Sequence, residues 1–199
     1  MEKPVKIAII DYGAGNIQSI RFALGRLGYA ADLTSDPARI READRVIFPG
    51  VGEAASAMRK LKQVELDAVI PVLTQPVLGI CLGMQLLCAA SEEGETQGLG
   101  IFPETVKRFP PGNKVPHIGW NTVAELRSPL FSGIPEGTFL YSVHSYYAPE
   151  SEFSIAKSRY GFPFSSALAR NNFYGVQFHP EKSGAPGARI LDNFIRLHP

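Results

Sequence analysis

Two kinds of hydrophobic pattern alternate along the first half of the chain. Mostly apolar runs, typical of parallel strands buried on both faces, lie at residues 5–10, 45–48 and 77–80, with a further strand predicted at 29–34. Segments with apolar residues at helical spacing lie between and after them, at residues 16–27, 53–73 and 83–90. Strands that alternate with helices in this way predict a mostly parallel central sheet with flanking helices.

The pattern changes after Ser91, where glycine and proline become frequent and the apolar runs shorten. Strands are predicted at residues 105–109, 138–141, 154–160, 165–169 and 173–177, and a closing helix at 188–197. We expect these strands to add a mixed or antiparallel sheet to the parallel core. No linker, low-complexity tract or repeat is visible, so residues 1–199 are predicted to form one α/β domain.

Composition narrows the class of protein. Of 199 residues, 45% are hydrophobic and 20% charged, with a net charge of +1, which is ordinary for a soluble globular protein. The sequence has no basic stripe for nucleic acid, and no apolar run that predicts a membrane span or a secretory signal. Two cysteines do not make a disulfide framework, so a cytoplasmic location is expected. No metal or cofactor is predicted, since no residues have metal-ligand spacing.

A candidate nucleophile lies where a predicted strand runs into a predicted helix. Gly79 and Gly83 flank Cys81 at two residues on either side, which is the pattern of a nucleophile elbow with a thiol as the nucleophile. Small neighbours leave room for the strained turn, and the helix N-terminus favours thiolate over thiol. The alternative is a buried structural cysteine, which we predict for Cys88 on the same helix. For Cys81 the elbow alone leaves both interpretations open.

A base for this nucleophile is predicted at the end of the last strand. His179 follows an apolar run, and Pro180 favours an extended backbone at His179. Residues i and i+2 of an extended chain project to one side, so Glu181 is expected to hold one ring nitrogen while the other faces Cys81. This is the nucleophile, base and orienting-acid arrangement of covalent catalysis. A plain surface turn is the alternative, and without Cys81 it would be preferred.

A glycine-rich turn follows the strand predicted at residues 45–48. Gly50 and Gly52 let backbone N–H groups approach a ligand, so the N–H groups of Gly52 and Leu82 are predicted to form an oxyanion hole. A phosphate-binding loop is the competing interpretation, but the sequence has no G-x-x-x-x-G-K-[ST] pattern. Ligands of open α/β sheets bind beyond the carboxyl ends of the strands, where this turn and Cys81 are both expected.

Three motifs together resemble those of the class I, or triad, glutamine amidotransferases, at residues 49–52 (PGVG), 79–85 (GICLGMQ) and 179–181 (HPE). Residues 11–16 (DYGAGN) and 116–121 (PHIGWN) resemble the family of glutaminase subunits of imidazole glycerol phosphate synthase. The resemblance spans nearly the whole chain and implies a flavodoxin-like fold, a Cys-His-Glu triad and glutamine as substrate. It also implies a heterodimer with a (β/α)8-barrel cyclase. That partner takes the ammonia to make imidazole glycerol phosphate and an aminoimidazole carboxamide ribotide in histidine biosynthesis.

The resemblance implies a substrate-binding group of residues, namely Gly50, Gln85, Glu93, His144, Ser145 and Tyr146. Glu93 would hold the α-ammonium of glutamine, and the backbone at Ser145 would receive its α-carboxylate. From the sequence alone, Gln85 is an ordinary polar helix position, Glu93 a solvated acidic turn and His144 a packed histidine. His117 and His198 have no evident partners, and no chemistry is assigned to them.

The resemblance also implies a partner interface, formed by Asp11, Tyr12, Gly13, Asn16 and Trp120. The alternatives are that the turn at 11–16 serves geometry alone, with Asn16 as a helix N-cap, and that Trp120 is a core residue.

Two other hypotheses remain open at this point. One is a different enzyme of the same fold, either the amidotransferase subunit of anthranilate or aminodeoxychorismate synthase or a γ-glutamyl hydrolase. Residues 11–16 and 116–121 argue against it. The other is a non-catalytic module that only docks a partner, and the intact set of Cys81, His179 and Glu181 argues against that.

Overall fold

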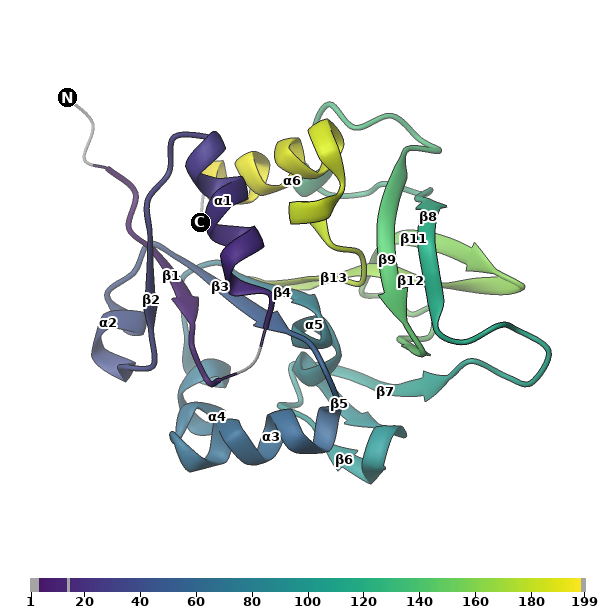
Figure 1. Ribbon diagram of the computed structural model, residues 1–199, viewed down its shortest axis with the longest axis horizontal. Helices are drawn as coiled ribbons and strands as arrows, with labels where there is room; N and C mark the ends of the chain where they lie inside the picture. The colour runs from purple at the N-terminus through teal and green to yellow at the C-terminus, as the bar shows by residue number, and fades with distance from the viewer. Residues whose placement is uncertain (1–3, 14, 198–199) are drawn as a thin grey trace.

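The computed structural model of the protein describes residues 4–13 and 15–197. Its centre is a seven-stranded sheet with the strand order β11-β12-β13-β4-β3-β1-β2 (Figure 1). The strands are β1 (Ile7–Ile10), β2 (Ala31–Thr34), β3 (Arg45–Gly50), β4 (Val77–Cys81), β11 (Ser154–Tyr160), β12 (Phe162–Arg170) and β13 (Phe173–Val176). The five strands from β13 to β2 are parallel, and β11 and β12 are antiparallel additions. The predicted parallel core with added antiparallel strands is therefore confirmed.

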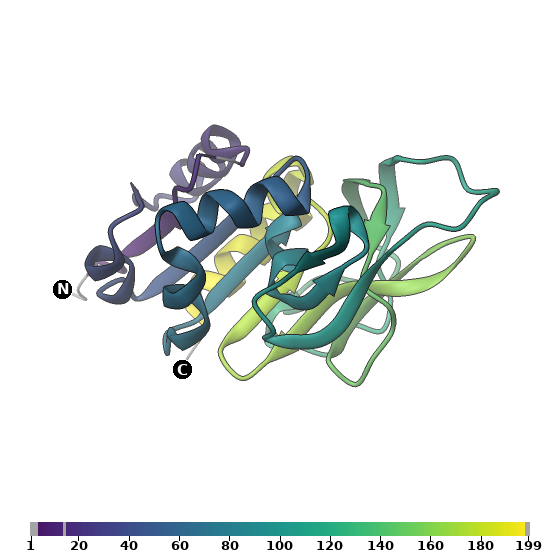
Figure 2. The ribbon, with the colours of Figure 1, turned by 90° about the horizontal axis from the view of Figure 1, so that it is seen from below.

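Helices cover both faces of the sheet, because the strand side chains alternate between two hydrophobic cores. Ile7 and Ile9 of β1 point to one core, and Ala8 and Ile10 point to the other. The first core is closed by α1 (Ile17–Arg26) and α6 (Gly184–Arg196), and the second by α3 (Ala54–Gln63), α4 (Leu66–Val69) and α5 (Leu82–Leu87). Figure 2 shows α3 lying across the near face of the sheet, with α1 and α6 beyond it. The short α2 (Pro37–Arg41) is capped by the Asp36 side chain.

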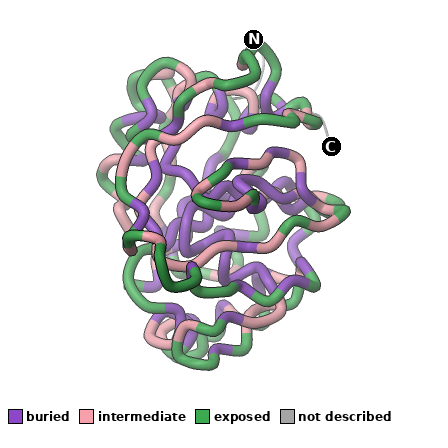
Figure 3. Tube along the Cα trace, turned by 90° about the vertical axis from the view of Figure 1, so that its right-hand side faces the viewer, coloured by how far each residue is buried: buried purple, intermediate pink, exposed green. Residues whose placement is uncertain are grey.

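Two smaller sheets lie beside the central one. The first has the order β10-β7-β5-β6 and the second pairs β8 with β9. Their strands are β5 (Cys88–Ser91), β6 (Thr96–Gln97), β7 (Phe102–Arg108), β8 (His117–Thr122), β9 (Phe139–His144) and β10 (Tyr146–Tyr147). Figure 3 views the molecule from the end at which these two smaller sheets lie. Buried chain fills the middle of this view, and exposed loops surround it. None of the helices in the described ranges has both the length and the apolar character needed to cross a membrane.

Two predicted elements differ from the structure. The helix predicted at residues 83–90 ends at Leu87, and Cys88 begins β5 instead of lying on the helix. Cys88 pairs with Phe102 of β7, and an apolar run carries no local sign of such a distant pairing. The helix predicted at residues 53–73 is broken at Glu65, which has a φ of 56°, so that α3 and α4 are separate helices.

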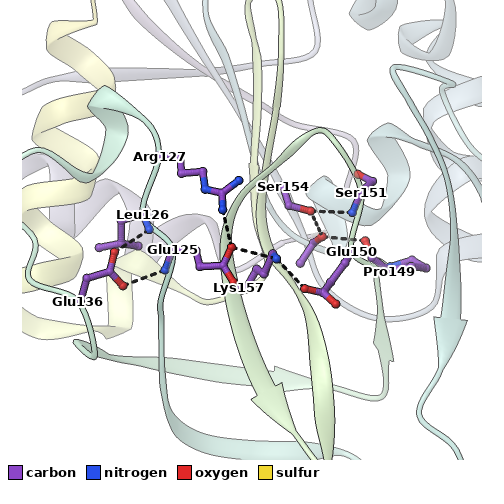
Figure 4. A network of polar contacts seen from close by, with 10 residues as sticks. Glu125, Leu126, Arg127, Glu136, Pro149, Glu150, Ser151, Ser154 and Lys157 are labelled. Atoms are coloured by element: carbon purple, nitrogen blue, oxygen red, sulfur yellow. Dashed lines mark hydrogen bonds and ion pairs between the residues drawn. The ribbon is translucent and has the colours of Figure 1, made fainter.

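A polar network fastens the loops around the outer strand β11 (Figure 4). Lys157 of β11 forms ion pairs with Glu125 at 3.0 Å and Glu150 at 2.8 Å. The Glu136 carboxylate accepts hydrogen bonds from the backbone N–H groups of Glu125 and Leu126. The loop after β8 and the loop before β11 are thus held to the same strand.

We expect a Gly83→Ala substitution to destabilise the protein severely. A Cβ at Gly83 would overlap the carbonyl oxygen of Phe48, which is backbone and cannot move aside. The free energy of unfolding should fall by about 3 kcal/mol or more in urea titrations, as for other cases of severe overpacking. The matched control is Gly25→Ala on the exposed face of α1, where nothing beyond the adjoining helix backbone lies within 4 Å of the added carbon. That helical change should stabilise by roughly 0.5–1 kcal/mol.

Candidate active site

Three parallel strands end side by side and bring the predicted motifs together. Gly50 at the end of β3 pairs with Cys81 at the end of β4, and Val176 at the end of β13 pairs with Ile80. The glycine-rich turn, the thiol and the segment that carries His179 therefore meet at one edge of the sheet. This is the ligand-binding edge of open α/β sheets, as the sequence predicted.

Cys81 occupies a strained turn between β4 and α5, with φ of 54° and ψ of −110°. The glycines on either side are required because α5 packs directly on the strand ends. A Cβ at Gly79 would lie 2.8 Å from the Met84 nitrogen, and one at Gly50 would lie 2.5 Å from the Gly83 nitrogen. The predicted elbow is confirmed in its geometry, and Cys81 is a free thiol at the cavity wall.

His179 lies between Cys81 and Glu181. Its Nδ1 is 2.8 Å from Glu181 Oε1, and His179 lines the same cavity as Cys81. Burial alone would lower the pKa of His179, but the hydrogen bonds and charges of Cys81 and Glu181 raise it to about 10. His179 therefore carries a proton at neutral pH. The three side chains have the mutual geometry of a nucleophile, a proton carrier and an orienting carboxylate.

The backbone that produces this contact differs from the one predicted. His179 is extended, with φ of −101° and ψ of 94°, but Pro180–Lys182 form a 3-10 turn. Glu181 thus reaches His179 around a tight turn, and not as the i+2 residue of an extended chain. The contact was predicted correctly and the reason for it was wrong.

The backbone of His179 is locked to β9 by a clamp of three hydrogen bonds. The His179 N–H donates to the Tyr141 carbonyl at 2.8 Å. The Ser183 hydroxyl accepts from the Tyr141 N–H at 2.9 Å and donates to the His179 carbonyl at 2.7 Å. The segment that carries His179 and the strand β9 are therefore joined directly.

A cavity of about 310 Å³ opens beside the sulfur, at the lower end of the range for small-molecule sites. It gathers most of the residues predicted to bind substrate or oxyanion, which are Gly52, Leu82, Gln85, Glu93, His144, Ser145 and Tyr146. Gly50 does not line the cavity; it packs behind the turn against α5. Sequence reasoning missed Val143 and Lys182, which also line it, as do Val51 and Pro116 of the motifs at 49–52 and 116–121. Lys182 follows the triad acid directly, so its position in the chain was an available signal.

Gln85 and Glu93 are each fixed on one side and open on the other. The Gln85 Nε2 donates to the Tyr146 carbonyl at 3.0 Å and to Gln177 Oε1 at 2.9 Å, which uses both amide hydrogens. Glu93 Oε2 accepts from the Ala54 N–H at 2.8 Å, at the start of α3. Burial, together with the charge of Glu53, raises the pKa of Glu93, and the hydrogen bond from Ala54 lowers it. Both residues keep an oxygen that can accept from an ammonium group.

His117 has a partner, contrary to the sequence-based expectation. Its Nδ1 lies 3.1 Å from Nε2 of His144, and His144 Nδ1 lies 2.8 Å from the Tyr146 carbonyl. The carbonyl only accepts, so His144 carries its proton on Nδ1 and receives one from His117. Burial lowers the pKa of His144 to about 3, so its ring stays neutral. His198 lies outside the described residues.

Comparison with known proteins identifies the family to which this chain belongs. The model of the family "Glutamine amidotransferase class-I" matches residues 8–197. The chain belongs to the class I glutamine amidotransferase family. Two full-length relatives are named "Imidazole glycerol phosphate synthase subunit HisH". The one from Bacteroides fragilis is 56% identical over 97% of this chain and 100% of its own. The one from Haemophilus influenzae is 48% identical over 98% and 99%.

Solved structures agree on the fold of this amidotransferase. A candidate GMP synthase component from Thermoplasma acidophilum has a TM-score of 0.77 at 21% identity, covering 98% of this chain and 94% of its own. A glutamine amidotransferase from Thermotoga maritima has a TM-score of 0.64 at 20% identity, covering 98% and 82%. At these identities the likeness concerns the class I amidotransferase fold.

The turn predicted to meet a partner is only partly on the surface of this amidotransferase. Tyr12 is buried, its hydroxyl donates to the Pro49 carbonyl at 2.9 Å, and its ring packs on Phe48. Its side chain is therefore not available for a partner, which corrects the prediction for Tyr12. Gly13 is exposed, while Asp11 and Asn16 are half-buried. Asn16 is the N-cap residue of α1, as the alternative held, but its side chain makes no hydrogen bond to the helix. Ala14 of this segment lies outside the described residues.

Trp120 lies on the surface and not in the core. Its neighbours on the outward face of the β8–β9 pair are Ile118 and Phe139, and the three are exposed by 55%, 60% and 58% respectively. The Trp120 ring packs edge-on against Tyr141 with centroids 5.9 Å apart. We call this face the exposed ribbon (Ile118, Trp120, Phe139). Contiguous apolar residues in the open are typical of a protein interface.

We predict that Glu181→Gln lowers the pKa of His179. The negative charge that favours the imidazolium is lost while burial remains, so a fall of about one to three pH units is expected. The pKa would be measured from the ring nitrogens by NMR across pH. Glu152→Gln, at an exposed carboxylate outside the cavity, is the control and should leave His179 unchanged. An unchanged pKa in Glu181→Gln would contradict the assigned cause.

The raised pKa of His179 also fixes the sign of its effect on stability. The folded pKa of about 10 exceeds the ordinary 6.5, so the folded state binds the additional proton. The stabilisation is present in full below pH 6.5 and is lost as the pH rises toward 10. The Glu181→Gln variant should lose less stability than the parent over this interval.

Proposed function

We propose that the protein hydrolyses glutamine to glutamate and ammonia through Cys81, His179 and Glu181. The single observation that carries this proposal is that Cys81 and His179 line one cavity of about 310 Å³, with Glu181 bonded to the His179 ring. The family membership supports the same reaction. Residues 1–199 would act together as one glutaminase unit.

The reaction proceeds in two halves. The Cys81 thiolate attacks the side-chain amide carbon of glutamine, and the carbonyl oxygen takes the negative charge. His179 gives its proton to the departing nitrogen, so that ammonia leaves and a glutamyl thioester remains. His179, now neutral, takes a proton from water, whose oxygen attacks the thioester. The sulfur leaves as thiolate, His179 is again protonated, and glutamate departs. Glu181 orients the ring throughout.

The developing oxyanion would be held by the N–H groups of Gly52 and Leu82. Both residues line the cavity, and Gly52 has a φ of 94°, which leaves its peptide free of the restraint a side chain would impose. A donor at this place contributes about 10²–10³ in rate. We therefore assign the turn at 49–52 as the element whose peptide orientation sets the activity.

The α-groups of glutamine would be bound at the far end of the cavity. The free oxygens of Gln85 and Glu93 suit the α-ammonium, and the backbone from His144 to Tyr146 suits the α-carboxylate. This division fits the described atoms, because the His144 ring is already occupied by Tyr146 and His117.

The ammonia would serve a separate synthase subunit in the cytoplasm. The relatives named HisH are subunits of imidazole glycerol phosphate synthase, so we propose a heterodimer with a (β/α)8-barrel cyclase. The exposed ribbon is the surface we assign to that partner, together with Asp11, Gly13 and Asn16 of the turn after β1. Tyr12 would act indirectly, because its hydroxyl holds the Pro49 carbonyl at the start of the oxyanion turn.

We predict that Cys81→Ser abolishes glutamine-dependent synthesis in the complex. The change removes the thiolate but little volume, so folding and partner binding should persist, and so should synthesis supplied with free ammonium. The measurement is product formation with glutamine or with ammonium as the nitrogen source. The control is Cys88→Ala, because Cys88 is buried against Met84 and away from the cavity. Parental glutamine hydrolysis in Cys81→Ser would rule out Cys81 as the nucleophile.

We also predict that Trp120→Ala weakens the cyclase complex and its stimulation of glutamine hydrolysis. Truncating a central aromatic residue of an interface costs about 2 kcal/mol or more, which corresponds to roughly thirtyfold in the dissociation constant. Calorimetry and glutaminase rates with and without the partner would measure both effects. Val72→Ala is the control, since Val72 is 65% exposed but precedes β4 and so lies at the opposite edge of the sheet. Equal partner affinities for the two variants would exclude the exposed ribbon.

A further inference from the structure

Strand register places Gln177 beside the nucleophile. The parallel pairing of β13 with β4 joins Val176 to Ile80, so Gln177, just past the end of β13, lies level with Cys81 at the end of β4. Gln177 is 1% exposed, and its Nε2 lies 3.7 Å from Cys81 Sγ in donor geometry. None of the roles assigned above to the triad, the oxyanion hole or the substrate-binding groups uses this side chain.

The direction of the Gln177 amide is fixed by its neighbours. The Tyr146 carbonyl can only accept, so the group that Gln85 turns toward it is Nε2, its donor. The second hydrogen of that nitrogen points to Gln177, which must therefore present its oxygen, Oε1, at 2.9 Å. The remaining end of the Gln177 amide, which faces the sulfur, is then the N–H donor. The Tyr146 carbonyl, acting through Gln85, thus determines that the sulfur of Cys81 faces the nitrogen of the Gln177 amide.

The Cys81 sulfur contacts a hydrogen-bond acceptor on one side and a hydrogen-bond donor on the other. The Val143 carbonyl, 3.7 Å from Sγ, accepts a hydrogen bond from the thiol. The Gln177 N–H donates to sulfur, and donation to an anion strengthens as the charge develops. The titratable groups around Cys81 are His179, with Glu181 behind it, together with Glu93, His144 and Lys182, which line the same cavity, and Tyr12 from the turn after β1, whose pKa is raised by burial and by the charge of Cys81. Gln177 is the uncharged donor in this set.

We propose that Gln177 is a further catalytic residue of the glutaminase site, whose amide N–H holds the Cys81 sulfur as a thiolate aimed into the cavity. The inference rests on the proposed function for its role in turnover. Gln85 and the Tyr146 carbonyl act as positioning groups, because they keep the amide in the donating orientation. Since both also line the substrate cavity, one line of hydrogen bonds joins the substrate end of the site to the nucleophile.

The test compares Gln177→Glu and Gln177→Met in the full-length chain carrying Cys88→Ala, so that Cys81 is the sole thiol. Glutamate keeps the oxygen that accepts from Gln85 and replaces the donor that faces sulfur, whereas methionine removes both polar ends. The second-order rate of alkylation by iodoacetamide, followed from pH 5.5 to 9, reports the thiolate without any substrate. At pH 7 we expect a fall of about tenfold in both variants, the size expected of a hydrogen bond to a charged group.

Turnover provides the second readout. In the complex with the cyclase, kcat for glutamine hydrolysis should fall by about tenfold, while KM stays within about twofold, because the contact is with the nucleophile and not with bound substrate. The matched control is Gln75→Glu. It removes an amide that donates to the Ile40 carbonyl at 2.7 Å, outside the cavity, and should change neither rate.

The results of these experiments distinguish the role of Gln177 from the proposed glutaminase function on which it rests. Parental alkylation rates in variants whose melting temperature is unchanged would overturn the role of Gln177. If Gln177→Glu fails to fold, Gln177→Met decides by the same criterion. If the parent complex hydrolyses no glutamine while alkylation still depends on Gln177, the proposed function fails and the contact between Gln177 and the thiolate stands.

Discussion

The close approach of α5 to the ends of β3 and β4 is the constraint on which the site depends. The backbone at Gly83 lies against the Phe48 carbonyl, and Gly50 and Gly79 leave no room for side chains of their own. The chain must therefore leave β4 and enter the helix within one residue, which forces Cys81 into its strained conformation. A looser packing of α5 would relax that turn, and the sulfur would no longer face the cavity.

The site also depends on keeping two neighbouring histidines in opposite states. His179 is held as a cation by Cys81 and Glu181, with a pKa of about 10, while burial lowers the pKa of His144 to about 3. In the proposed reaction, the proton that serves the leaving group therefore resides on one ring only. The fixed hydrogen bonds of His144 then make it part of the cavity wall. Environment, and not residue type, assigns the two roles.

The sequence predicted those features that depend on residues close together in the chain. The glycines around Cys81 mark a backbone that only small residues permit, and the apolar runs that end at Gly50 and Cys81 mark neighbouring strand ends. The burial of Tyr12, the pairing of His117 with His144 and the position of Gln177 could not be predicted in this way. Each of them arises from strands that meet across long separations in the chain. The start of β5 at Cys88 was missed for the same reason, since its partner strand lies further along.

The hydrogen bonds of the Ser183 clamp join the exposed ribbon rigidly to His179. Tyr141 lies in β9 beneath the Trp120 ring, and its backbone is bonded both to His179 and to the Ser183 hydroxyl. A force applied to the outer face of the ribbon is therefore borne by the same hydrogen bonds that hold the imidazole in place. The rigidity of the active site therefore depends in part on a surface that lies outside it.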